Sequence, residues 1–500
     1  MRWFVGVFAI AQTILVFSGC GTSAQNTQVQ SDPDYVYAPH LDPRGRDLLP
    51  YNGTTKNVLL YNATILTAAG DRIENGYLWL KDGKIARISA QAIDATGAEV
   101  VDLQGKFVTP GLIDTHSHLG VYAHPGVSAH SDGNEATSPS TPFVDSLYSV
   151  WPQDPGFDRA VAGGVTLMQI LPGSANLVGG DAVTIQMHPG VSARAMVVEV
   201  APRGIKMACG ENPKRVYGNR GQLPSTRMGN RAMFRRTFQK AIELRQAIAR
   251  HEREMKRWLS DPEKNADTEP PTPPARDHGL EALLRVLAGE TLVHVHCYRA
   301  DEMVQILELA DEFGFSIRSF HHAVEAYKIR DLLSSWEVGV STWADWWGFK
   351  IEAHDAVLEN AALLSSAGVR SIIHSDSAIG IQRLNQEAAK AYYAGLGAGI
   401  SLTEDDALRW ITANPAWALG VDEHTGTIEE GKRADVVVWS HHPFSTYARA
   451  DLVFVEGVME YDRSQRDREP WSDFELGNLP PAGPVAPVEV IELPDAEVDQ

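Results

Sequence analysis

Cysteine is scarce in this sequence, with three among 500 residues. Cys20 lies in the N-terminal segment, which leaves Cys209 and Cys297 in the rest of the chain. Two cysteines are too few for the disulfide framework that stabilises small secreted domains. Packing in the hydrophobic core is the default expectation for both, and a single bridge between them stays open.

Positive charge is also in short supply. The chain has 44 Lys and Arg against 64 Asp and Glu, a formal net charge of -20. Binding of nucleic acid phosphates requires clustered basic residues. The composition therefore argues against nucleic acid as a partner, whereas an acidic balance mainly favours solubility.

Long apolar runs are absent beyond the N-terminal segment. A membrane-spanning helix needs about 20 consecutive apolar residues, and no later segment has that length. The first twenty residues resemble a bacterial export signal: Arg2 supplies positive charge, an apolar run covers 3–17, and Phe17-Ser18-Gly19-Cys20 is similar to a lipobox. We expect Cys20 to be lipidated and the exported protein to be periplasmic or anchored to the outer membrane, with the lipid as its only membrane contact. A buried N-terminal helix or a membrane span is the alternative.

What is present is the composition of an ordinary soluble globular protein, with 44% hydrophobic and 22% charged residues. A chain of this length exceeds the usual size of one core. We predict a signal peptide over 1–20, a flexible tether over 21–50 and a Pro-rich acidic tail over 463–500. Short strand patterns fill 51–108 and 426–462, and we expect these segments to form one small discontinuous β-sandwich.

Residues 109–425 alternate short apolar strand candidates with helical stretches, which is typical of a parallel sheet. The strand candidates number eight: 112–118, 165–171, 195–200, 205–209, 291–297, 315–322, 338–342 and 370–376. A (β/α)8 barrel of the TIM type is the economical assignment. A charged helical insertion over about 231–289 interrupts the rhythm, and its charges are expected to face solvent.

Side chains suited to metal binding lie on these strand candidates. His116 and His118 are two residues apart, so they face the same side of a strand and can bind one metal. The spacing alone does not distinguish histidines that bind a metal from histidines that pack in the core or lie at the surface. The segment TPGLID (109–114) leads directly into it, and here the sequence resembles the amidohydrolase superfamily. The stretches GGVTLMQILPGSANLVGG, GIKMACGENPKRVYG and GTIEEGKRADVVVW extend the likeness to the imidazolonepropionase-like and metal-dependent dipeptidase-like branch.

The resemblance implies further ligands on later strands. His296 takes the fifth-strand position because it lies nearer than His294 to the strand's C-terminal end, and His294 is expected to be a core histidine. His321 and His322 are adjacent and so should face opposite sides of the sixth strand. The family pattern is a His followed by a small residue and, two positions later, a Glu, and it selects His322 with Ala323 and Glu325. His321 is then expected to pack outward or to cap the neighbouring helix.

Asp376, after the eighth strand, matches the family's metal-binding carboxylate. It would accept a proton from water and pass it to the leaving nitrogen, whereas a helix N-cap is the alternative role. Lys206, on the fourth strand, matches the lysine that is carboxylated and bridges two metals in binuclear relatives. The alternative is an ordinary surface or loop lysine. Zinc is the expected divalent metal, with one or two per chain.

Loop residues at the C-terminal face of the barrel are candidates for substrate contact: Tyr298 and Arg299, then Trp346, Trp347 and Lys350. Arg299 would suit a substrate carboxylate.

We therefore predict a metal-dependent hydrolase that cleaves the C-N amide bond of a small peptide-like or cyclic substrate. This is an EC 3.5-like activity, and peptidase activity stays open. A mononuclear deaminase or cyclic-amide hydrolase is the first alternative. A non-catalytic lipid-anchored binding protein is the second, and an oligomer stays open.

Overall fold

The computed structural model describes residues 51–465. The expected signal peptide with Cys20, the expected tether over 21–50 and the acidic tail beyond 465 lie outside the described residues. Among the helices of the described part, none is both long and apolar enough to cross a membrane.

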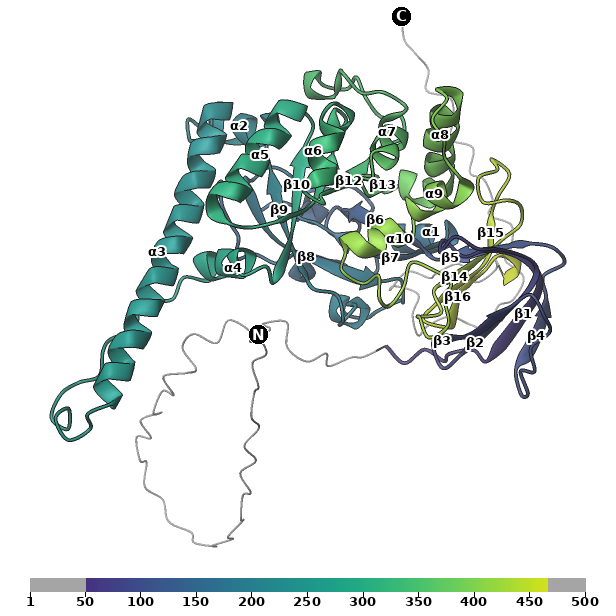
Figure 1. Cartoon of the computed structure of the whole chain (residues 1–500), viewed down its shortest axis with the longest axis horizontal. Coiled ribbons are helices and arrows are strands. Elements are labelled where there is room, and N and C mark those ends of the chain that lie inside the picture. Colours follow the sequence, from purple (N-terminus) through teal and green to yellow (C-terminus); the bar gives the residue numbers. More distant parts are fainter. Residues whose placement is uncertain (1–50, 466–500) are drawn as a thin grey trace, which may run out of the picture. The chain divides into compact units, whose positions relative to one another are not determined.

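The centre of the fold is an eight-stranded sheet that curls into a nearly closed barrel (Figure 1). Its strands, in chain order and in sheet order, are β6 (Leu112–Ser117), β7 (Val165–Ile170), β8 (Val178–Gln186), β9 (Arg203–Ala208), β10 (Thr291–Cys297), β11 (Ile317–His322), β12 (Gly339–Thr342) and β13 (Ser371–Ile373). The two ends of the sheet meet where the Asp376 backbone N–H donates to the His116 carbonyl over 3.0 Å. The fold is thus mixed α/β with a barrel core, as the sequence predicts.

The prediction of a strand at 195–200 is wrong. Residues Ala193–Met196 form a short 3-10 helix, and the third barrel position belongs to β8, which runs antiparallel to both β7 and β9. The reason is the short connection over 171–177, because a parallel partner would need a crossover of about a dozen residues or more. The barrel therefore departs from regular (β/α)8 connectivity at this one position.

The helices flank the strands of the barrel (Figure 1). They are α1 (Gly156–Ala162), α2 (Glu211–Gly218), α3 (Arg227–Leu259), α4 (His278–Leu287), α5 (Ala300–Phe313), α6 (Arg330–Ser335), α7 (Asn360–Ser366), α8 (Leu384–Gly397), α9 (Glu404–Arg409) and α10 (Ala413–Ala418). The Thr226 side chain caps α3 by accepting from Gly229 N. Phe234 and Phe238 in the first half of α3 are buried, whereas its later turns are mostly exposed and extend away from the barrel.

A second eight-stranded sheet combines segments from before and after the barrel. Its strands are β1 (Val58–Leu66), β2 (Arg72–Lys81), β3 (Lys84–Ser89), β4 (Glu99–Asp102), β5 (Phe107–Pro110), β14 (Val436–Trp439), β15 (Ala450–Val455) and β16 (Val458–Asp462). The two segments join where β14 pairs antiparallel with β5. The hydrogen bonds connect all these strands into one sheet, and its division into the two layers of a β-sandwich stays a prediction.

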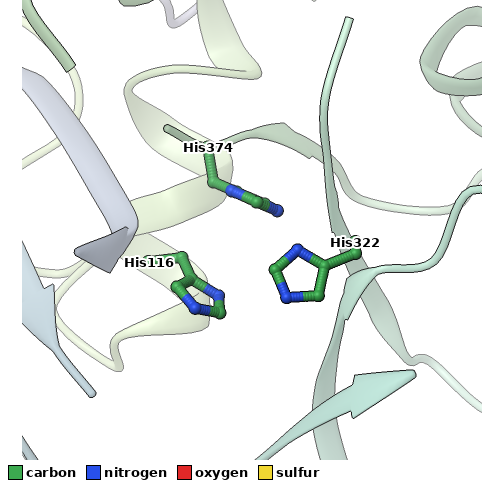
Figure 2. Close-up of side chains that lie close together, drawn as sticks. All are labelled: His116, His322 and His374. Carbon is green, nitrogen blue, oxygen red and sulfur yellow. The ribbon is translucent and has the colours of Figure 1, made fainter. Parts of the chain in front are cut away.

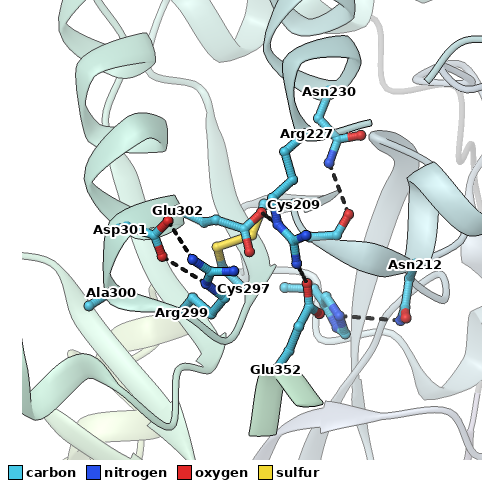
Figure 3. Close-up of a disulfide and its surroundings, with 12 residues drawn as sticks. Cys209, Asn212, Arg227, Asn230, Cys297, Arg299, Ala300, Asp301, Glu302 and Glu352 are labelled. Carbon is cyan, nitrogen blue, oxygen red and sulfur yellow. Dashed lines mark hydrogen bonds and ion pairs between the residues drawn. A yellow bond between two sulfur atoms is a disulfide. The ribbon is translucent and has the colours of Figure 1, made fainter. Parts of the chain in front are cut away.

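The question left open for the cysteines is answered by the fold. Cys209 directly follows β9 and Cys297 ends β10, two neighbouring parallel strands. Their Cα atoms lie 5.2 Å apart and the sulfurs form a disulfide (Figure 3). The bridge therefore ties two barrel strands together at their C-terminal ends.

Candidate metal centre

Three side chains from the two ends of the barrel sheet converge on one point. His116 lies in β6, all of whose residues are buried, His118 follows it, and Asp376 follows β13. The His116 and His118 Nε2 atoms are 3.3 Å apart, and Asp376 Oδ1 lies 3.7 Å from the first and 3.4 Å from the second. These ligand atoms are close enough to share a metal ion.

A second group of imidazoles shares His116 with the first. His116, His322 and His374 point toward one another (Figure 2), with ligand atoms all within 4.8 Å. Within residues 51–465, both ring nitrogens of His374 and Nδ1 of His322 are buried without a hydrogen-bond partner. Buried polar atoms without partners are rare and costly. These nitrogens are therefore suited to a ligand.

Sequence reasoning missed His374. A signal was present, because His374 precedes Asp376 by two residues and so should face the same side of the strand.

The donor set fits a divalent metal. Imidazole and carboxylate are the usual ligands of zinc and other first-row metals. Burial lowers the pKa of His118 and of His374 to about 3, so both rings are neutral and keep a lone pair for binding. Burial raises the pKa of the Asp376 carboxyl to about 7, against the lowering effect of Lys206.

Lys206 lies inside the barrel, not at the surface or in a loop. Its side chain projects from β9 and is 1% exposed. Nζ donates to the Pro172 carbonyl over 3.1 Å and lies 3.4 Å from His116 Nε2. Burial lowers the pKa of this amine to about 7.

His296 is buried beside these groups but belongs to neither. Its ring contacts that of His322 at 4.5 Å between centroids. Its Nε2 lies 3.3 Å from the Asn212 amide nitrogen. The structure thus brings five of the six predicted ligands into direct proximity, namely His116, His118, Lys206, His322 and Asp376. It places His296 next to them.

The expectation that His321 packs outward is wrong. His321 is fully buried, and its Nδ1 lies 2.9 Å from His116 Nδ1. The alternation of sides fails here because His322 and Ala323 have positive φ angles of 69° and 38°, which end the regular strand. Both adjacent histidines therefore reach the barrel interior. His294, expected in the core, is fully buried.

The candidate substrate residues differ in their relation to the centre. Tyr298 stacks on His322 at 5.0 Å, and Lys350 Nζ lies 3.9 Å from the Tyr298 ring centroid. Trp346 is 39% exposed and stacks at 5.7 Å on Trp343, which in turn stacks on His322 at 4.4 Å.

The other two loop candidates are an arginine paired with a neighbouring carboxylate and an exposed tryptophan. Arg299 turns toward Asp301 and makes two hydrogen bonds of 2.9 Å to it (Figure 3). Trp347 is 45% exposed.

Comparison with known proteins places these features in context. The family model described as "Amidohydrolase family" matches residues 107–462. Amidohydrolase tasK of Hapsidospora irregularis is 32% identical over 443 residues, which cover 84% of this chain and 43% of that protein. The chain therefore spans less than half the length of this relative.

Two further matches extend over most of both chains. Imidazolonepropionase of Mesorhizobium japonicum is 25% identical over 403 residues, covering 73% of this chain and 87% of that one. An amidohydrolase from Thermotoga maritima MSB8, known from a crystal structure, is 36% identical in sequence and superposes with a TM-score of 0.71. The match covers 81% of this chain and 100% of the Thermotoga chain.

Proposed function

The chain belongs to the amidohydrolase family, and on that basis we propose that it hydrolyses a C-N amide bond in a small molecule with the help of a bound divalent metal. The observation that carries the proposal is the convergence of His116, His118 and Asp376 at the end of β6 and β13. Barrel enzymes assemble their active sites at the C-terminal ends of the strands. A peptide-like or cyclic amide is the proposed substrate class.

The residues that would hold metal form two adjoining sets. His116, His118 and Asp376 would bind one zinc-like ion, and His296 and His322 a second, with carboxylated Lys206 between them. His374, which lies beside His116 and His322, would add a further imidazole to the same centre. The 3.4 Å separation of Lys206 Nζ from His116 Nε2 supports a bridging place for Lys206. A bound divalent metal makes hydroxide available from water near neutral pH and polarises a carbonyl group.

Exposure separates the side chains that can reach a substrate from those that cannot. The Asp376 and His118 side chains are 25% and 19% exposed, whereas those of His116 and His322 are each 1% exposed. Asp376 is therefore the group that can exchange protons at the reacting bond. It accepts a proton from the attacking water and then gives it to the leaving nitrogen.

The substrate would lie against the residues around Tyr298. Lys350 Nζ, 3.5 Å from Glu352 and 3.4 Å from Asn212 Oδ1, can orient a polar substrate group. Trp346, which is 39% exposed and stacks on the buried Trp343, provides apolar surface for the substrate. Arg299 would contact a substrate carboxylate by exchanging its Asp301 partner for the ligand.

Turnover of a defined panel tests the activity. The zinc-supplemented full chain would be assayed on dipeptides, N-acyl amino acids and lactams, with Asp376→Asn as the test variant. Asp355→Asn, which changes an exposed carboxylate, is the control. We expect turnover by the wild type and the control, with a loss of at least about 1000-fold in Asp376→Asn because proton transfer and a ligand are lost together. Undiminished turnover by Asp376→Asn would refute the proposal.

Metal content separates this proposal from the mononuclear alternative, a deaminase or cyclic-amide hydrolase. We expect two metals per chain in the wild type and one in Lys206→Met. One metal in both proteins would contradict the binuclear centre, and release of ammonia would identify a deaminase.

Export as a lipoprotein is a separate proposal that rests on the sequence around Cys20. Mass spectrometry of the protein from its native membrane fraction would detect a lipid on Cys20. An unmodified N-terminus that still includes Met1 would contradict it.

A further inference from the structure

Inside the barrel, three imidazoles and one amide form a continuous buried series. His116 Nδ1 lies 2.9 Å from His321 Nδ1, and His321 Nε2 lies 2.9 Å from His294 Nδ1. His294 Nε2 in turn lies 3.4 Å from the side-chain amide of Gln169. All four side chains belong to residues at most 1% exposed. The series joins β6, β11, β10 and β7, so it crosses the barrel interior.

The direction of each hydrogen bond in this series follows from its first member. A neutral imidazole has one ring hydrogen, so it donates through one nitrogen and accepts through the other. If His116 binds a metal through Nε2, its hydrogen is on Nδ1 and is donated to His321 Nδ1. His321 must then donate from Nε2 to His294 Nδ1. His294 is left with its hydrogen on Nε2.

Gln169 is the group that must accept this last hydrogen. Its amide nitrogen faces His294, while its Oε1 is buried without a hydrogen-bond partner among the described residues. Rotation of the amide by 180° places Oε1 against His294 Nε2 and breaks no bond of that oxygen. The series then ends on an acceptor, and every imidazole has one donor and one acceptor role.

We propose that His321, His294 and Gln169 are positioning residues that hold His116 as the Nδ1–H tautomer, with its Nε2 lone pair directed at the metal. The inference rests on the metal dependence of the proposed function. A ligating histidine commonly donates its other N–H to a partner that fixes the ring. In this chain the partner is a relay of two further imidazoles that ends on a neutral amide.

Substitutions of Gln169 separate positioning from simple packing. Gln169→Glu keeps an acceptor, whereas Gln169→Leu has a similar size and no acceptor. If Gln169 only fills space, Gln169→Leu should bind metal more tightly than Gln169→Glu, because a buried carboxylate is costly. If Gln169 accepts the last hydrogen bond of the relay, Gln169→Glu should bind metal more tightly than Gln169→Leu. Gln239→Leu, on the exposed face of α3, is the matched control.

The experiment measures the Kd for Zn²⁺ alone, by chelator competition, in the metal-stripped full chain. We expect Gln169→Glu and Gln239→Leu to stay within about threefold of the wild type, and Gln169→Leu and His321→Phe to bind roughly 10- to 100-fold more weakly. Wild-type affinity in Gln169→Leu, or equal losses in the Glu and Leu variants, would overturn the relay.

The wild type provides a second readout that needs no variant to fold. In ¹⁵N spectra of the zinc-loaded chain, we expect protonated-nitrogen signals for His116 Nδ1, His321 Nε2 and His294 Nε2, and the reverse tautomers would overturn the inference. Zinc binding without hydrolysis of any amide would refute the proposed function and leave the relay intact. A wild type that binds no zinc would refute both.

Discussion

Ser375 donates two hydrogen bonds to Asp114 across the closure of the barrel. Its hydroxyl donates to Asp114 Oδ2, and its backbone N–H donates to Oδ1 over 3.2 Å. Oδ1 also accepts from the His116 backbone N–H over 3.0 Å. Asp114 thus links β6 directly to the segment that carries Asp376.

Loss of the Asp114 carboxylate should therefore loosen the closure. Asp114→Ala leaves three buried donors without their acceptor, and we expect the free energy of unfolding to fall by about 3 kcal/mol. Asp114→Asn keeps one acceptor oxygen and should lose about 1 kcal/mol. Urea unfolding, with the exposed-site variant Asp132→Ala as control, measures both. A wild-type unfolding midpoint in Asp114→Ala would show that the link does not hold the closure.

His374 should have opposite effects on stability and on metal binding. Its two ring nitrogens are buried without partners in the described residues, so His374→Phe removes an unsatisfied polar group at similar size. We expect the metal-free variant to be at least as stable as the wild type, because apolar replacement of such a group is neutral or favourable. Its zinc affinity should fall by about tenfold or more. Thermal unfolding and zinc titration test the two parts, and unchanged zinc affinity would exclude His374 from the centre.

The bridge between Cys209 and Cys297 should contribute a large share of the stability. The two residues are 88 positions apart, and closing a loop of this length stabilises a protein by about 4.6 kcal/mol in the chain-entropy model. The double variant Cys209→Ser, Cys297→Ser should unfold at lower urea concentration by a corresponding amount. Reductant should shift the wild type to the same midpoint and leave the variant unchanged. If reductant has no effect on the wild type, the bridge is absent in solution.

The pH dependence of stability should reveal the buried pair of His188 and Glu460. His188 Nδ1 lies 2.6 Å from Glu460 Oε1, and the ring stacks on Tyr51 at 4.2 Å. Burial opposes protonation of His188, but hydrogen bonds to Glu456 and Glu460 outweigh it and raise the pKa of the ring. Because the pKa is raised in the folded state, protonated His188 stabilises the protein. This stabilisation is complete below the unfolded pKa of about 6.5 and is lost as pH rises through the folded pKa.

His188→Phe keeps the stacking and removes the charge. We expect the stability difference between wild type and variant to be larger at pH 6 than at pH 9, as measured by urea unfolding at both values. A difference that grows toward pH 9 would show that His188 is neutral in the fold.

The local pattern of apolar and polar residues was sufficient to predict most strands of the barrel and part of the candidate metal site. Apolar runs located seven of the barrel strands, because strands that are buried on both faces are rich in apolar residues. The two-residue period of a strand placed His116 and His118 on one side. The family resemblance added Asp376 and Lys206, which the structure brings next to them.

The tertiary structure alone decided the remaining features. β8 became antiparallel because its connection is short, and Cys209 met Cys297 because β9 and β10 are neighbours. His321 entered the barrel because the backbone turns to positive φ at His322, which no residue type in the segment signals. Periodicity says which side of a strand a residue faces, but it holds only while the strand is regular. Which strands become neighbours, and where they end, depends on packing between residues far apart in the chain.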